Sequence, residues 1–191
     1  MARSRMLLVL LSAVVVLASP MVYAQQPAAK AAAKAPAAGA GPTLLIDTVK
    51  GPIEVELYPA DAPKSVARIL ELVKANFYRG LRVHHAQAGV VQFGDPTSRN
   101  MQKQMDWGYG GSGQRIGVKE TSKRSFDRGA VGYAYQSDRK PEDADSQMFI
   151  IRIANPGING KYALLGHVTK GMDVVDKLAV TDVIKNVTLK P

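Results

Sequence analysis

Two of the three histidines in this 191-residue chain, His84 and His85, are adjacent in the sequence. Adjacent side chains on a strand point to opposite faces, so the pair cannot hold one metal ion between them, and we predict no metal site and no cofactor. A single imidazole can still donate hydrogen bonds, one when neutral and two when charged. Either one histidine serves a binding site in this way, or the pair is a core residue and a surface residue without a chemical role.

The elements around the histidines are short and amphipathic. Residues 44–46 and 53–57 alternate between apolar and polar side chains, and the Lys-Gly-Pro sequence at 50–52 predicts the turn of a hairpin between them. An apolar stripe at helical spacing predicts a helix of about a dozen residues that begins at Pro63 and ends near Asn76. Many short strands without a βαβ rhythm favour a closed or nearly closed antiparallel barrel. The remaining strands are predicted at residues 81–85, 89–94, 130–135, 148–153, 163–168 and 183–189, and a second helix at 171–178.

The first 24 residues have the three parts of a secretory signal peptide. Arg3 and Arg5 make a basic start, residues 6–17 make an apolar run broken only by Ser12, and cleavage is expected after Ala24. An apolar run of about a dozen residues is short for a membrane span, which needs roughly 20, so export with cleavage is favoured over a transmembrane anchor. We therefore expect a periplasmic or secreted protein without stable membrane insertion after cleavage.

The composition divides the rest of the chain into a tether and one domain. Residues 25–42 have no large apolar side chain, which predicts a disordered tether ahead of a single domain at 43–191. The formal net charge is +9, and about +5 remains when the four basic residues before the domain are set aside. This basicity is scattered and lacks an aromatic stripe, so no nucleic-acid partner is expected. The chain has no cysteine and can form no disulfide.

Eight short motifs, in order along the domain, resemble those of the cyclophilins, a family of peptidyl-prolyl cis-trans isomerases. The resemblance implies a mainly β fold, a closed eight-stranded antiparallel β-barrel capped by two α-helices. It also implies a shallow outer groove that binds an extended peptide around a proline, and we expect the protein to be a monomer. The motifs are GPIEVEL at 51–57, APKSV at 62–66, FYRGL at 77–81, QFGDP at 92–96, RGAV at 128–131, SQMFI at 146–150, NGKY at 159–162 and GMDVVD at 171–176.

The resemblance also implies the residues of the site. In the family, an arginine donates a hydrogen bond to the twisted prolyl amide, and His85 occupies its place here. Catalytic roles are further implied for Gln92, which would fix the donor and the substrate, and for Phe149, which would floor the proline pocket. His84 matches the family's strand histidine and is predicted to be a hydrogen-bonded structural residue. The substrate-binding residues implied in the same way are Val90, Tyr133, Ala134, Tyr135, Gln147, Met148, Ile158 and Tyr162.

The histidine in place of the arginine decides the functional prediction. Rotation about an X–Pro bond needs no nucleophile, but the loss of one preorganised donor costs ~2.7–4 kcal/mol of transition-state stabilisation. We predict an isomerase that helps exported proteins fold by acting on their proline-containing unfolded or extended segments. Its activity should be reduced unless Arg82, Arg99 or Arg115 replaces the missing guanidinium. One alternative is a peptide-binding or chaperone module without catalysis, and another is a basic scaffold that binds anionic cell-envelope polymers.

Overall fold

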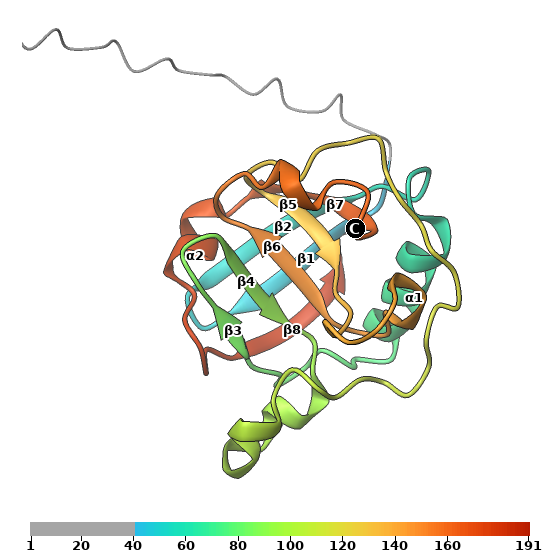
Figure 1. Ribbon diagram of the computed structural model, residues 1–191. Coiled ribbons are helices and arrows are strands. Elements are labelled where there is room, and N and C mark those ends of the chain that lie inside the picture. The colour runs from blue at the N-terminus through green and yellow to red at the C-terminus, as the bar shows by residue number, and fades with distance from the viewer. Residues whose placement is uncertain (1–40) are drawn as a thin grey trace, which may run out of the picture. The chain divides into compact units, whose positions relative to one another are not determined.

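The strands of the computed structural model, which describes residues 41–191, form one eight-stranded sheet that curls into a barrel (Figure 1). Neighbouring strands pair antiparallel in the order β3-β4-β6-β5-β7-β2-β1-β8. The predicted mainly β architecture is confirmed. The strands are β1 (Thr43–Thr48), β2 (Gly51–Leu57), β3 (His85–Ala86), β4 (Val90–Phe93), β5 (Ala130–Tyr133), β6 (Met148–Ile151), β7 (Leu164–Lys170) and β8 (Ile184–Leu189).

The gap between the edge strands β3 and β8 is closed by the residues that precede each of them. Arg82 and Val183 form a bridge there, and the N–H groups of Gly80 and Ile184 donate to the carbonyls of Ile184 and Leu81. Next to it, the Val83 N–H donates to the Asp182 carbonyl over 2.9 Å. The barrel is therefore joined at this seam by an irregular segment and not by a ladder between β3 and β8. The strand predicted at 81–85 was wrong, because the backbone there turns from β8 toward β4 within a few residues and forms no continuous ladder with either.

Alternating side chains fill the barrel interior, and two helices cover it. Ile46 of β1 and Val55 of β2 are buried, as the period of two predicts. Helix α1 (Pro63–Lys74) begins at a proline, which is tolerated there because the N–H groups of a first helical turn have no partner within the helix. The helix buries an apolar stripe that includes Ile69. Helix α2 (Met172–Lys177) packs near β2 on the other side of the barrel from α1 (Figure 1).

The polar segment between β4 and β5 is fixed to the barrel by a buried carboxylate. It begins with the short 3-10 helices η1 (Pro96–Arg99) and η2 (Met101–Asp106), which project from the barrel (Figure 1). Asp95 accepts hydrogen bonds from the backbone N–H groups of Thr97, Gly108 and Gly110, so the chain that leaves η2 returns to the sheet. Two further 3-10 helices, η3 (Pro141–Asp143) and η4 (Pro156–Ile158), lie in the connections after β5 and β6.

The predicted signal peptide at 1–24 and most of the predicted tether at 25–42 lie outside the described residues. Residues 41–42 already belong to the folded domain, because the Leu57 N–H donates to the Pro42 carbonyl over 2.9 Å. Within residues 41–191, no helix is long and apolar enough to cross a membrane.

Candidate active site

An apolar pocket with a cavity volume of about 340 Å³ lies on the outer face of β4, β5 and β6. Phe149 of β6 lies at its base and is 5% exposed. Its ring lies across Gly132 of β5, where any Cβ atom would collide with the phenyl ring. The glycine thus leaves the space in which Phe149 forms the floor of the pocket. The other aliphatic side chains that line the pocket are Val90, Ala134, Ile151, Ile153 and Ile158.

Three other aromatic rings hold the floor and close one wall of the pocket. The rings of Phe126 and Phe149 are stacked with their centroids 5.6 Å apart, and Tyr162 meets Phe149 edge-on at 5.2 Å. Tyr135 packs against Tyr162 at 4.7 Å. Such pairs contribute about 0.5–1.5 kcal/mol each beyond the burial of their area. The pocket therefore has a firm apolar base for a small ring.

The polar rim of the pocket comes from β3 and β4. His85 and Gln92 are opposite each other in the ladder between these strands, and both line the pocket. The side-chain amide of Gln92 donates to Oε1 of Gln147 over 2.7 Å, which leaves its own Oε1 and a second N–H for a ligand. His85 and Gln92 thus present hydrogen-bonding groups beside the apolar floor.

Gln147 is itself held by the segment that returns from η2. Its amide donates to the carbonyls of Gly108 and Gly110 at 2.8 and 2.7 Å. Asp95 accepts the N–H groups of the same two glycines. A chain of hydrogen bonds therefore runs from the buried carboxylate of Asp95 to Gln92 and orients the amide of Gln92 at the rim.

His84 lies behind the rim and is mostly buried. Neither ring nitrogen has a partner in good hydrogen-bond geometry among the described residues, and the polar side chain that acts on the ring is the amide of Gln147. The ring of His84 packs against Gly108, where a Cβ atom would lie 3.5 Å from Cδ2. Burial lowers the pKa of His84 to about 4, and the negative charge of Asp95 opposes this shift only in part. His84 is therefore neutral at pH 7 and adds no positive charge to the pocket.

Within residues 41–191, no arginine side chain lines this pocket. Arg82 donates to the Thr181 carbonyl over 3.0 Å, and Arg99 donates to backbone carbonyls at the exit of α1. Arg115 is 2.7 Å from Asp143 in an adjoining cavity. None of the three predicted candidates therefore places a guanidinium in the pocket, where His85 and Gln92 are the polar residues of β3 and β4.

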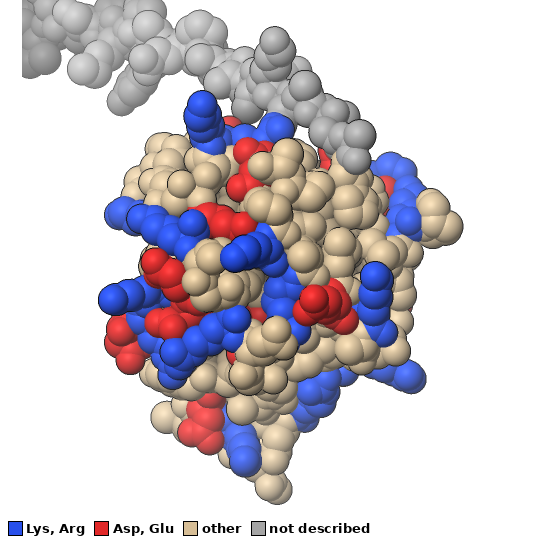
Figure 2. All heavy atoms as spheres, turned by 90° about the vertical axis from the view of Figure 1, so that its right-hand side faces the viewer, with Lys and Arg blue, Asp and Glu red and all other residues tan. Residues whose placement is uncertain are grey.

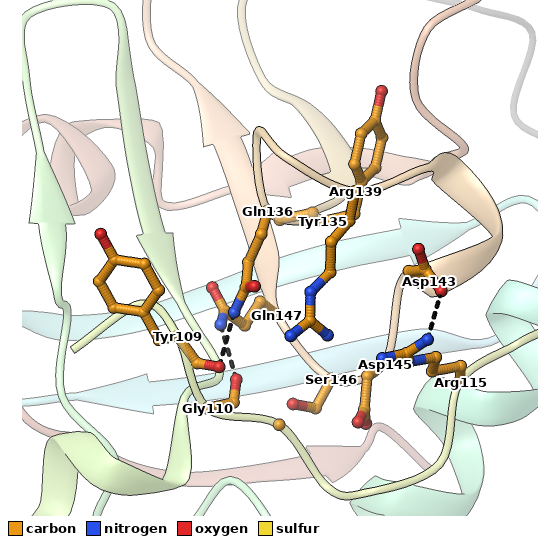
Figure 3. Close-up of a pocket in the computed structure, with 12 residues that line it drawn as sticks. Tyr109, Gly110, Arg115, Tyr135, Gln136, Arg139, Asp143, Asp145, Ser146 and Gln147 are labelled. Atoms are coloured by element: carbon orange, nitrogen blue, oxygen red, sulfur yellow. Dashed lines mark hydrogen bonds and ion pairs between the residues drawn. The ribbon is translucent and has the colours of Figure 1, made fainter. Parts of the chain in front are cut away.

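Two more cavities adjoin the apolar pocket. The first cavity has a volume of about 640 Å³ and lies between the rim and the segment after η2. It shares His85 and Gln92 with the pocket, and Trp107 and Tyr109 line it from the segment after η2. The other, shown in Figure 3, shares Ala134 and Tyr135 with the pocket and has charged walls. The three cavities are therefore neighbours, and Tyr135 lines all of them.

Comparison with known proteins gives the family. A family model described as cyclophilin type peptidyl-prolyl cis-trans isomerase/CLD matches residues 43–191. The chain belongs to this family. A probable peptidyl-prolyl cis-trans isomerase of Brucella suis is 39% identical over 140 residues, which cover 71% of this chain and 70% of that protein. A peptidyl-prolyl cis-trans isomerase of Helicobacter pylori is 32% identical over 146 residues, covering 74% and 83%.

A solved structure supports the cyclophilin fold. The cyclophilin type isomerase of Cryptosporidium parvum, crystallised in the presence of the dipeptide Ala-Pro, matches with a TM-score of 0.65 and 25% identity. The match covers 78% of this chain and 99% of that one. The chain is therefore a cyclophilin in sequence and in fold, and its enzyme class is peptidyl-prolyl cis-trans isomerase.

The cyclophilin pocket brings together most of the residues that the sequence singled out. Gln147 lines the two adjoining cavities instead of the apolar pocket. Tyr133 and Met148 do not reach the groove and are 1% and 0% exposed. Their predicted substrate-binding role was wrong, because each precedes a groove residue on a strand and faces the barrel core. The predicted residues that line the pocket are His85, Val90, Gln92, Ala134, Tyr135, Phe149, Ile158 and Tyr162.

Five pocket residues were missed in the sequence. Ile151 and Ile153 follow Phe149 at spacings of two and four, so the alternation of β6 could have identified them. Gln87 and Gly89 come from the turn between β3 and β4, and Asn155 comes from the loop after β6. These three have no periodic signal, because turns place side chains by their own geometry.

Proposed function

We propose that this cyclophilin isomerises X–Pro bonds in unfolded or extended segments of exported proteins, more slowly than family members with an arginine at the position of His85. The observation that carries the proposal is the apolar pocket floored by Phe149, with His85 and Gln92 on one rim. A prolyl ring in this pocket has its amide beside the rim donors. The reaction needs only that the amide be held while it twists, with no covalent intermediate.

The physical basis is stabilisation of the twisted amide. Planarity of the X–Pro amide comes from delocalisation of the nitrogen lone pair, and rotation returns that lone pair to nitrogen. A donor at the rim interacts better with the twisted amide than with the planar one and so lowers the barrier. Because His85 has fewer donors than a guanidinium, its stabilisation of this state is smaller.

A protease-coupled assay with a proline-containing tetrapeptide tests this function. The purified protein should accelerate the slow cis-to-trans phase, and Phe149→Ala, which removes the floor of the pocket, should abolish most of the acceleration. Circular dichroism would establish that the variant is folded. An unchanged slow phase with the wild-type protein would refute the proposed catalysis.

Export is proposed from the signal-peptide pattern of residues 1–24. The experiment is expression of the full chain in a Gram-negative host, followed by fractionation and N-terminal sequencing of the recovered protein. The expected product begins at Gln25 and is found in the periplasm or the medium. A product that keeps residues 1–24 and remains in the cytoplasm would contradict export.

We propose chaperone-type binding of apolar chain segments as a second function, carried by side chains on and after η2. Met105 is 92% exposed, Tyr109 73% and Met101 45%. Exposed methionines adapt their shape to many apolar partners. Tyr109 also lines the 640 Å³ cavity next to His85, so a chain bound in the groove can continue toward η2.

The proposal of a scaffold for anionic polymers has less support. Figure 2 shows the face that carries α1, and basic and acidic side chains alternate there. Several of them are paired, including Arg68 with Glu71 and Arg124 with Asp61. A polyanion binder instead concentrates one sign of charge on one surface.

A further inference from the structure

The charged cavity next to the proline pocket has a volume of about 60 Å³ and is lined by two arginines and two aspartates (Figure 3). One water needs about 10–15 Å³ on this measure, so the cavity suits the end of one side chain and not a larger ligand. It shares Ala134 and Tyr135 with the proline pocket. A peptide bound by its proline therefore passes the mouth of this cavity.

The two carboxylates of the cavity already have donors for all their oxygen atoms. Oδ1 of Asp143 accepts from Arg115 over 2.7 Å, and Oδ2 accepts from the backbone N–H of Lys140 over 3.2 Å. Oδ1 of Asp145 accepts from the backbone N–H and the hydroxyl of Ser112, and its Oδ2 accepts from the backbone N–H of Gly113 over 2.9 Å. The charge of each aspartate is therefore already partly compensated by donors of the protein itself.

Arg139 is in the opposite situation. Figure 3 shows its side chain directed into the cavity, and its guanidinium makes no hydrogen bond or ion pair with any of the described residues. Its charge is felt in the cavity: the pKa of Asp143 lies below its usual value, first through the Lys140 N–H, then through the charges of Arg115 and Arg139. The cavity thus has an arginine without a partner, whereas every carboxylate oxygen already accepts a hydrogen bond, and this favours a ligand that accepts hydrogen bonds and carries negative charge.

We infer that this cavity selects an acidic side chain, glutamate or aspartate, in the substrate, and that Arg139 determines the preference. The inference rests on the proposed isomerase function and adds a substrate class to it. Side chains two residues apart in an extended peptide lie on the same side, about 7 Å apart. The acidic residue is therefore expected two positions from the proline, on the side of the peptide that runs toward Ala134.

Matched peptides test the preference. Each would carry Glu, Gln or Lys two residues before the proline, and a second set would carry them two residues after it. With the wild-type protein, we expect kcat/KM to be about two- to fivefold higher for Glu than for Gln in one of the sets, the range of a solvent-accessible ion pair. Addition of 0.5 M salt should remove most of the difference.

Variants then assign the preference to one side chain. Arg139→Gln should bring the ratio of Glu to Gln to about one, and Arg139→Glu should reverse it in favour of Lys. Arg79→Gln removes an exposed arginine that lines none of these cavities and should leave the ratio unchanged. A wild-type ratio of one in both sets, or a ratio that survives Arg139→Gln, would overturn the inference.

The neutral peptide separates this inference from the proposed function. Turnover of the Gln peptide reports isomerisation alone, so its presence together with a ratio of one rejects only the acidic preference. If the Gln peptide is not turned over, the proposed catalysis fails. Fluorescence anisotropy of labelled peptides would then still measure the ratio of Glu to Gln in binding, with the same variants and the same expected direction.

Discussion

Replacement of His85 by arginine is the most informative single change in this groove. His85 lies opposite Gln92 on the rim of the proline pocket and also lines the neighbouring cavity of about 640 Å³. The larger guanidinium therefore has room without displacing the aromatic floor. At this position it would present its donors to the prolyl amide, and we expect His85→Arg to raise kcat/KM.

The size of the gain follows from two opposing contributions. A preorganised donor is worth ~2.7–4 kcal/mol in the transition state. An arginine introduced here must be immobilised, which costs about 1.5–2 kcal/mol of side-chain entropy. Asp138 lines the same cavity and can compete for the guanidinium. The net gain is then about 1–2 kcal/mol, or about five- to thirtyfold in kcat/KM.

Gln87→Arg is the matched control, because Gln87 is exposed and lines the same pocket at a different edge. It adds the same charge without placing the donors opposite Gln92. The protease-coupled assay at low peptide concentration measures kcat/KM directly for both variants and the wild-type protein. Equal gains in the two variants, or no gain in His85→Arg, would refute the assignment of His85 to the position of the catalytic donor.

Three further changes test other parts of the structure. Gly132→Ala should destabilise the protein by ~1–3 kcal/mol in urea unfolding and slow isomerisation, because the added methyl group displaces the floor ring. At Gly89 an added methyl group meets open space, so Gly89→Ala should leave the free energy of unfolding unchanged. The free energy of unfolding should fall by up to about 3 kcal/mol from pH 6.5 to 4, because His84 is protonated in the unfolded chain below pH about 6.5 but stays neutral in the folded protein until pH about 4. His84→Leu should lose this part of the pH dependence, and the same dependence in the variant and the wild-type protein would contradict the prediction. Met105→Gln should weaken the ability of the protein to suppress aggregation of an unfolded protein, while its turnover of the tetrapeptide stays unchanged. Val49 is an exposed apolar residue in the β1–β2 turn, and Val49→Gln should change neither property. Equal losses of suppression in both variants would argue against a binding surface at η2.

Local patterns in the sequence were sufficient for most of the fold. The hairpin of β1 and β2, helix α1 and the antiparallel barrel follow from periods of two and of 3.6 and from turn residues. The seam of the barrel did not follow from them. At residues 81–85, backbone partners come from distant parts of the chain, and the alternating pattern there does not show that the pairing is irregular.

The errors at the site have one cause in common. Tyr133 and Met148 were assigned to the groove together with their neighbours Ala134 and Phe149, although adjacent residues on a strand face opposite sides. The same rule would have replaced Met148 by Ile151. Strict alternation is thus a stronger guide to this groove than the position of a motif.

Other features depend on loops and could not be read from the sequence. The ring of His84 packs against Gly108, which Asp95 holds in place through its carboxylate. The charged cavity depends on the path of the loop that carries Arg139, which has no periodicity. Contacts between distant parts of the chain decide such positions, and these contacts leave no local pattern in the sequence.

The central claim is that the pocket above Phe149, with His85 and Gln92 on its rim, accelerates rotation about X–Pro bonds. Two-dimensional NMR exchange spectroscopy on a proline peptide measures this directly at equilibrium and needs no protease. We predict cis–trans exchange cross-peaks in the presence of a catalytic amount of the wild-type protein and their loss with folded Phe149→Ala. Binding of the peptide to the wild-type protein without any exchange cross-peak would contradict the claim and leave a peptide-binding module in its place.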